Sequence, residues 1–180
     1  TTNLPLVWAN MMSQSQETFL AFTTASDFIS GESSDGLQVT KLALNYLLQA
    51  MDTEYIDSQE LELHLKGLLD SRLPARMWRT QELIAQQLSP ISDLLARYIE
   101  RTRCTNAQQE QEVTIMRNIF SKMFADKVQP LASQLNHYQY QLNPAFEALV
   151  EHPNIPPSFS SYVQSQYIDS AQLYKTAMQE

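Results

Sequence analysis

The sequence predicts a single all-α domain over residues 1–180, a helical bundle of seven to eight helices with long, proline-kinked central helices. Apolar residues recur at spacings of three and four almost everywhere, and strict alternation is nearly absent. Only three glycines occur, whereas sheets need many left-handed turn positions. A hydrophobic content of 43% in 180 residues is enough to build one core.

The first helix is predicted from Pro5 to Ser30, because proline is favoured in a first turn and an apolar stripe follows it. The segment from Gly31 to Gly36 holds two of the three glycines and predicts a loop. A second helix is predicted over residues 37–51. It is apolar over more than half of its circumference, which indicates a central, buried position.

The spacing of Asp57 and Glu60 is that of a capping box, so a third helix is predicted to begin there. It ends near residue 73, because a proline disfavours helix at the residue before it. Pro74 opens the next helix, whose apolar stripe keeps its phase through Pro90. The retained phase favours one helix kinked at Pro90. The alternative is a new helix capped by Ser89.

A polar corner is predicted at residues 104–112. Two apolar stripes follow it, and they differ in phase by one residue near Pro130, which predicts a break that redirects the chain or a change of packing partner. Asn143 and Pro144 predict the start of a short helix ending at residue 151. Residues 152–157 contain three prolines and predict an extended crossing. The last helix is predicted to start at Ser158.

The net charge of −8 argues against nucleic acid as the main partner, because binding a polyanion requires an excess of Lys and Arg. Residues 1–62 carry nine acids and one base, whereas residues 63–127 carry seven acids and ten bases. We therefore expect the acidic N-terminal third to pack beside the basic middle. The alternative is a basic docking face.

The sequence contains no nucleophile elbow, phosphate-binding loop or nicotinamide fingerprint, so no catalytic residue is predicted. One cysteine, Cys104, is too few for a disulfide or a cysteine-based zinc site. Glu60 and His64 have metal-ligand spacing, but a surface pair explains them better. We expect neither a metal nor a cofactor.

No run of about eighteen apolar residues occurs, so no membrane span is predicted. The N-terminus lacks a basic signal region, although a signal removed earlier would leave no trace in this sequence. The expected location is cytoplasmic.

Two groups of residues are candidates for binding a protein partner. The last helix is rich in aromatic residues and poor in charges, which suits a surface that a partner covers. The alternative is docking onto its own domain. A basic cluster surrounds Pro74 and could bind an acidic group. The candidates are Phe159, Tyr162, Tyr167 and Tyr174 in the last helix, and Lys66, Arg72, Arg76, Trp78 and Arg79 in the cluster.

These patterns favour a non-enzymatic helical protein-interaction module: an adaptor, regulator or assembly factor, with a homodimer as one of its forms. The alternative is a ligand-binding or sensory domain that holds an apolar small molecule between helices. An enzyme using His64, His137 or His152 beside a carboxylate is the third reading.

Overall fold

The computed structural model describes residues 3–30, 35–101 and 107–177, and these residues form helices and connecting segments without any strand. The all-α prediction is confirmed. The helices are α1 Leu4–Ser13, α2 Gln16–Thr23, α3 Leu37–Ala50, α4 Ser58–Ser71, α5 Leu73–Arg101, α6 Ala107–Met123, α7 Gln129–Glu151, α8 Pro157–Val163 and α9 Ser170–Ala177. Two π-helical segments, η1 Phe124–Val128 and η2 Gln164–Asp169, join α6 to α7 and α8 to α9.

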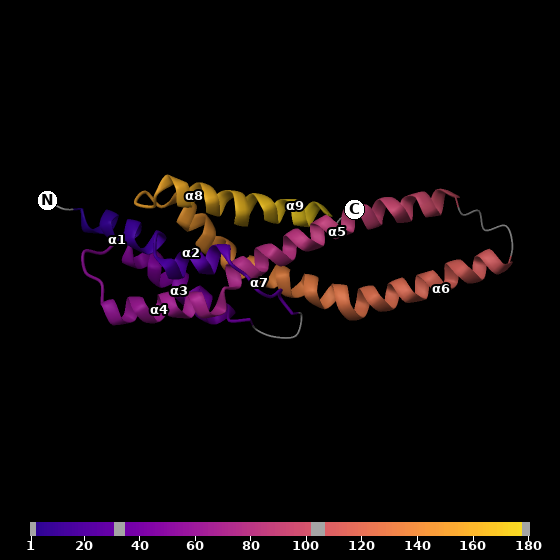
Figure 1. Cartoon of the computed structure of the whole chain (residues 1–180), viewed down its shortest axis with the longest axis horizontal. Coiled ribbons are helices and arrows are strands. Elements are labelled where there is room, and N and C mark those ends of the chain that lie inside the picture. The colour runs from indigo at the N-terminus through magenta and orange to yellow at the C-terminus, as the bar shows by residue number, and fades with distance from the viewer. Residues whose placement is uncertain (1–2, 31–34, 102–106, 178–180) are drawn as a thin grey trace.

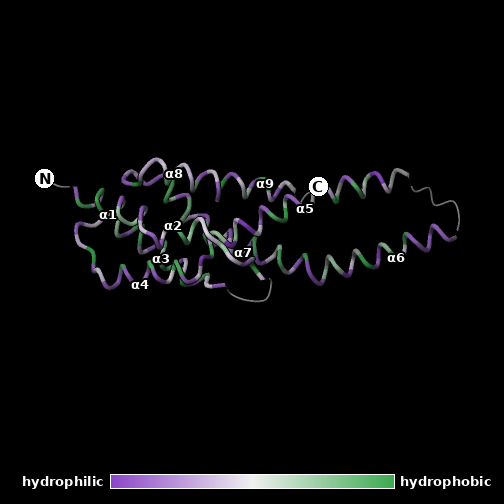
Figure 2. The backbone as a smooth tube through the Cα atoms, viewed as in Figure 1, coloured by the Kyte–Doolittle hydropathy of each residue, from purple (hydrophilic) through white to green (hydrophobic). Residues whose placement is uncertain are grey.

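The molecule has two regions (Figure 1). The body gathers α1–α4, residues 73–85 of α5, α7 and the α8–η2–α9 rod around the core. The arm consists of residues 86–101 of α5 and residues 107–123 of α6, which extend together away from one end of the body. Hydrophobic and hydrophilic stretches alternate along both helices of the arm (Figure 2).

The core of the body is centred on Phe22 of α2. Its ring lies in edge-on contact with the rings of Phe146, Phe159 and Tyr167, at centroid distances of 6.2, 5.4 and 5.3 Å. Such edge-to-face pairs stabilise a fold beyond the area that they bury. Helices α2, α7 and α8–η2 are therefore held together through one aromatic cluster.

The prediction of one helix from Pro5 to Ser30 is wrong. Ser15 separates α1 from α2, and its hydroxyl accepts a hydrogen bond from the Thr18 amide at 3.1 Å, as the N-cap of a new helix does. Residues 24–30 are not helical. Side chains of α5 form hydrogen bonds with the backbone of this segment. These bonds take the place of the backbone hydrogen bonds that a helix would form.

The α3–α4–α5 connections follow the sequence closely. Gly36 has a positive φ of 83° at the start of α3, where a side chain would also approach Ser71 too closely. Asp57 caps α4 and accepts from the amides of Gln59 and Glu60 at 2.8 and 3.2 Å, which confirms the predicted helix start. Arg72 has a φ of 45° and separates α4 from α5.

Pro90 lies inside α5, which is continuous from Leu73 to Arg101. The prediction of one helix is confirmed, and the alternative of a new helix capped by Ser89 is not. Pro74 occupies the first turn of α5, where a missing amide hydrogen costs nothing.

The interruption predicted near Pro130 is present, as a π-helical segment rather than as the end of a helix, and the packing changes there, because α7 packs on α3 and α8. The structure places η1 between α6 and α7, and the three segments follow one another as one continuous, bent rod (Figure 1). A π turn contains one residue more than an α turn, so it absorbs the one-residue phase shift between the two apolar stripes. Pro130 then lies in the first turn of α7, where it is tolerated.

The separate helix predicted from Pro144 is also absent, because α7 runs through to Glu151. Pro144 removes a hydrogen bond to the carbonyl of Tyr140. The side chain of Tyr140 is 78% exposed, so this loss falls on the solvent side of the helix. Residues 152–156 are non-helical as predicted, but they form a turn closed by the Ile155 amide on the His152 carbonyl rather than an extended crossing. The last helix begins at Pro157, one residue before the predicted Ser158.

Candidate interaction surface

Most of the arm's described side chains are exposed. From residue 86 onward, every α5 side chain that the structure describes is exposed. On α6 the described side chains of residues 108–123 are exposed except those of Gln109 and Val113, which are half-buried. The two helices do not pack closely against one another over these residues, and they lie apart in Figure 1. The exposed side chains among those described are therefore not covered by the other helix of the arm.

The exposed side of α5 in the arm continues the side that faces the core in the body. Leu73 and Met77 are buried there, and Gln81 donates to Gln139 of α7 at 3.2 Å. Ile91 lies two turns beyond the partly buried Ile84, at a helical spacing of seven. The same apolar stripe thus leaves the body and becomes solvent-exposed, with Ile91 49% exposed and Leu94 67% exposed.

A matching stripe lies on α6. Ile115, Met116, Ile119 and Met123 fall within about 100° of the helix circumference, because residues three, four and seven apart share a face. Each of these four side chains is exposed by 40% or more. A soluble helix normally buries such a stripe, so the stripe marks a surface that another helix can cover.

Charge is distributed differently in the arm and in the rest of the chain. The arm holds four acids and four bases, so it is neutral. Sixteen acids and seven bases lie outside the arm and outside residues 102–106. The acidity of the chain therefore belongs to the body, and the arm can approach another molecule without a strong electrostatic bias.

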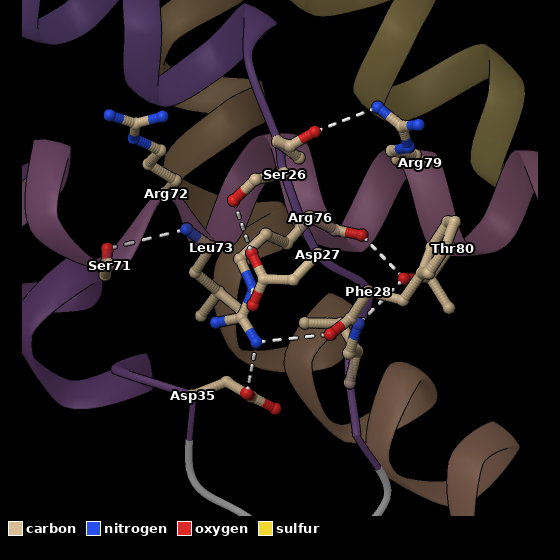
Figure 3. A network of polar contacts seen from close by, with 12 residues as sticks. Ser26, Asp27, Phe28, Asp35, Ser71, Arg72, Leu73, Arg76, Arg79 and Thr80 are labelled. Atoms are coloured by element: carbon tan, nitrogen blue, oxygen red, sulfur yellow. Dashed lines mark hydrogen bonds and ion pairs between the residues drawn. The ribbon is translucent and has the colours of Figure 1, made fainter.

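The basic cluster predicted around Pro74 is largely satisfied by its own chain (Figure 3). Arg76 Nη2 donates to Asp35 Oδ1 at 2.6 Å and to the carbonyl of Phe28 at 3.2 Å. Its Nε lies 3.0 Å from Asp27 Oδ2, and the two groups form an ion pair. The Nε–H bond does not point at the carboxylate well enough to form a hydrogen bond. The expected pairing of the acidic N-terminal third with the basic middle is confirmed at these residues.

Other members of the cluster also have partners within the body. Arg79 donates to the carbonyl of Ala25 at 2.8 Å, and its guanidinium lies 5.4 Å from the centroid of the Phe28 ring. Arg72 Nε donates to the carbonyl of Leu69 at 3.3 Å. Trp78 packs against the core, and Lys66 is exposed on α4. A shallow polar groove lies beside Arg72 and Arg76, and the adjoining acids Asp27 and Asp70 also line it.

The aromatic residues of the last helix dock onto their own domain. The hydroxyls of Tyr162 and Tyr167 both donate to the carbonyl of Phe22, at 2.9 and 2.5 Å. This carbonyl lies in the last turn of α2, where the helix has no further amide to donate to it. Burial raises the pKa of the Tyr167 hydroxyl well above its ordinary value.

Tyr174 is buried as well, and Phe159 and Tyr162 are partly buried against the core. Burial raises the pKa of both the Tyr162 and the Tyr174 hydroxyls. Tyr167 and Tyr174 therefore present no surface to a partner in this conformation. A partner-binding role for the four aromatics has no further support and stays a prediction.

The histidines have local structural contacts. His152 accepts from the Asn154 amide at 3.2 Å, and its Nε2 lies 3.3 Å from Asp52 Oδ1 without the alignment of a hydrogen bond. The side chain of Asn154 also donates to the carbonyl of Met51. This hydrogen bond connects residues 152–156 to the end of α3. The ring of His64 stacks on Tyr46 at 4.3 Å. Cys104 lies outside the described residues.

Within residues 3–30, 35–101 and 107–177, no three His, Cys, Asp or Glu side chains gather closely enough to hold a metal ion. An apolar pocket inside the body, between Met12, Phe22 and Leu44, has a volume of only about 10 Å³. A cavity of that size is at the lower limit for a single water molecule. It gives no support to an apolar ligand at the centre of the body.

Sequence reasoning identified the stripe of α5 but missed the arm as a surface. The stripe includes Ile91, and the sequence shows its phase correctly, yet apolar residues at this spacing are usually buried. The signal that could have identified the arm is the balanced charge of its two helices. This balance distinguishes the two helices from the acidic remainder of the chain.

The fold and the exposed stripes define an all-α protein with a packed helical body and a two-helix arm. The chain belongs to the family DUF3080, described as a protein of unknown function, whose model matches residues 1–180. No curated protein and no solved structure is significantly similar to the chain. None of the described helices combines the length and apolar character needed to cross a membrane.

Proposed function

We propose that this chain is a non-enzymatic helical protein-interaction module, an adaptor, regulator or assembly factor, and that its arm is the interaction surface. One observation carries the proposal: α5 and α6 each expose an apolar stripe beyond a body whose own core is closed. Isolated apolar residues on a surface are ordinary, whereas two aligned stripes are not.

The stripes have the spacing by which helices recognise other helices. Anchors three, four and seven residues apart form one continuous edge that fits into a groove or against a second stripe. Burying one exposed Leu or Ile side chain contributes about 1.5–3 kcal/mol. Several such side chains on α5 and α6 are enough to hold a partner after the cost of association.

Two methionines make the α6 stripe adaptable. Met116 and Met123 are unbranched and polarisable, so they adjust to partners of different shape. The nine residues predicted from the sequence lie in the body rather than in this surface. Of these, Lys66 is exposed. It lies on α4, which belongs to the body (Figure 1).

A site-specific cross-linking experiment tests the proposal. A photo-cross-linking amino acid is placed at position 94 in the arm, or at position 63 in the body, in cells that produce the protein naturally. Leu94 and Leu63 are 67% and 68% exposed, so they are matched in residue type and accessibility. We expect defined adducts, identified by mass spectrometry, at position 94 and not at position 63. Equal labelling at both positions, or none at position 94, contradicts the proposal.

A further inference from the structure

We propose that Met116 and Met123 form a methionine-oxidation site, through which a peroxide converts the α6 stripe from an apolar surface into a polar one. The inference rests on the proposed function, because the stripe belongs to the proposed interaction surface. Oxidation turns a flexible thioether into a polar sulfoxide, and this change disrupts interfaces that are built on methionine. The oxidised arm therefore loses its partner while the body keeps its fold.

The reaction needs only the two thioethers and a peroxide. The sulfur lone pair attacks one oxygen of hydrogen peroxide, and the O–O bond breaks as the S–O bond forms. The proton on the transferred oxygen moves to the departing hydroxide, which leaves as water. The sulfur loses two electrons and the peroxide gains them. Two thiols reverse the change in a sulfoxide reductase: they are oxidised to a disulfide, and the sulfoxide oxygen leaves as water.

Exposure divides the methionines of the described residues into two groups. One group is buried in the core of the body, each residue at most 2% exposed: Met12, Met51 and Met77. The other group reaches solvent, with exposed fractions of 44% for Met11, 40% for Met116 and 62% for Met123. A peroxide oxidises exposed sulfurs sooner than buried ones, because the reaction requires access. Limited oxidation therefore changes the surface and leaves the core intact.

The two arm methionines lie on one side of α6. They are seven residues apart, which places them within about 20° of each other around the helix and about 10.5 Å apart along it. Ile119 lies between them on the same side, three residues after Met116 and four before Met123. A partner helix that packs along this side covers both sulfurs as well as Ile119.

Oxidation changes binding because a sulfoxide oxygen is a strong hydrogen-bond acceptor. Burying such a group without a donor costs free energy. The α6 stripe consists of Ile115, Met116, Ile119 and Met123, so two of its four members change at once. The two isoleucines do not react with peroxide, so the modification of the stripe is confined to its methionines.

Met11 is the matched methionine outside the arm. Its exposure is close to that of Met116, but it lies on α1, at the end of the body far from the arm (Figure 1). Its oxidation alters no residue of the α6 stripe. Met11 therefore separates the effect of a sulfoxide in the arm from the effect of a sulfoxide elsewhere on the surface.

The first test measures oxidation rates in the purified full chain. The folded protein is treated with hydrogen peroxide, samples are quenched at intervals, and peptide mass spectrometry gives the oxidised fraction at each methionine. We expect Met116 and Met123 to react about tenfold faster than the three buried methionines, while helix content by circular dichroism stays unchanged. Similar rates in the two groups, or a loss of helix content as the arm methionines react, overturns the inference.

The second test asks whether these sulfoxides control binding. The photo-cross-linking residue at position 94 reports contact with a partner in cells, with and without brief treatment with hydrogen peroxide. We expect the treatment to lower the yield of wild-type adducts about tenfold. In a chain that carries both Met116→Leu and Met123→Leu the stripe stays apolar and cannot be oxidised, so the yield should persist. A leucine variant as sensitive to peroxide as the wild type overturns the inference.

A mimic of the oxidised arm removes the need for peroxide. A chain with both Met116→Gln and Met123→Gln carries two polar side chains in the stripe, and we expect about tenfold fewer adducts from it in untreated cells. Met11→Gln is the control and should leave the yield within about twofold of the wild type. Helix content by circular dichroism shows whether both variants are folded. Equal adduct yields from the two folded variants contradict a specific role of the arm methionines.

The outcomes separate this inference from the proposed function. If position 94 labels a partner and peroxide does not lower the yield although both sulfoxides form, control by oxidation is wrong and the interaction module stands. If position 94 labels nothing in untreated cells, the proposed function is wrong and the inference fails with it. Loss of adducts on oxidation, retained adducts in the leucine variant and a low yield in the glutamine variant together support both.

Discussion

The body and the arm are built from similar amphipathic helices, yet they use their apolar faces in opposite ways. In the body, the stripe of α5 is buried against α7 and α9, and aromatic rings and hydrogen bonds fix its neighbours. In the arm, the continuation of that same stripe meets solvent. Amphipathicity therefore identifies a side of a helix that needs a partner, and tertiary structure decides whether the partner belongs to the same chain.

This contrast predicts that stability resides in the body. Phe146 is fully buried and its ring contacts those of Phe22 and Tyr167. We expect Phe146→Ala to lower the free energy of unfolding by about 3–5 kcal/mol, because it removes apolar contact and leaves a cavity. Denaturant unfolding followed by circular dichroism measures the change. A loss below about 1 kcal/mol would mean that the aromatic cluster is not the centre of the core.

The next largest effect is expected at the polar contacts that hold residues 24–30 and Asp35 to α5. Arg76 pairs with Asp35, whose side chain is only 4% exposed. Arg76→Ala removes the cation that faces this buried carboxylate and is expected to cost about 2–3 kcal/mol. Tyr138, which donates to Asp35 at 3.1 Å, limits the loss.

Lys66→Ala is the matched control for Arg76→Ala. Lys66 is an exposed basic residue of the same predicted cluster, and we expect its removal to change stability by less than about 0.5 kcal/mol. Equal effects of the two variants in denaturant unfolding would show that the Arg76 contacts contribute nothing beyond a surface charge.

A smaller effect is expected at the contact between the last helix and α2. Tyr167→Phe removes one of two hydroxyls that bond the Phe22 carbonyl, and should cost about 1 kcal/mol at neutral pH. Burial raises the pKa of Tyr167 above the value of about 10 for an unfolded tyrosine. The folded state thus holds this proton more tightly than the unfolded state does.

The stability that Tyr167 contributes is therefore complete below about pH 10 and falls as the pH rises further. In Tyr167→Phe the free energy of unfolding should decline less steeply above pH 10 than in the wild type. Other tyrosines with raised pKa values, including Tyr174, preserve part of the slope. Identical slopes in the two proteins would contradict the linkage.

The sequence predicted those features of the fold that are determined locally. The cap at Asp57 and the first-turn positions of Pro5 and Pro74 follow from the geometry of a helix end, whereas the first-turn position predicted for Pro144 is wrong because this residue lies inside α7. The continuous phase of the stripe through Pro90 identified α5 as one helix. The sequence located the phase shift near Pro130 correctly, but it did not show that a π turn produces the shift. A one-residue shift fits either a break or a π turn, and only the surrounding packing selects between them.

Features that depend on distant residues were beyond the reach of the sequence. Ile29 fits a helical stripe, yet its amide bonds to Thr80 of α5, which lies far along the chain. The exposure of Leu94 could not be predicted either, because nothing in its own helix shows that α6 lies apart. The candidate surface is therefore visible only when both helices of the arm are placed relative to the body.

The smallest expected change in stability is in the arm itself. Leu94→Ala and Ile119→Ala remove apolar side chains as large as many in the core, but these side chains are 67% and 55% exposed. We expect each variant to lie within about 0.5 kcal/mol of the wild type. Denaturant unfolding of the dilute protein measures this.

Amide hydrogen exchange compares the two regions directly. Amides of the arm should exchange faster than those of the body in the purified chain, since helices that nothing covers open more often. If arm amides are as protected as body amides, the arm is stable without a partner and the contrast between the two regions is lost.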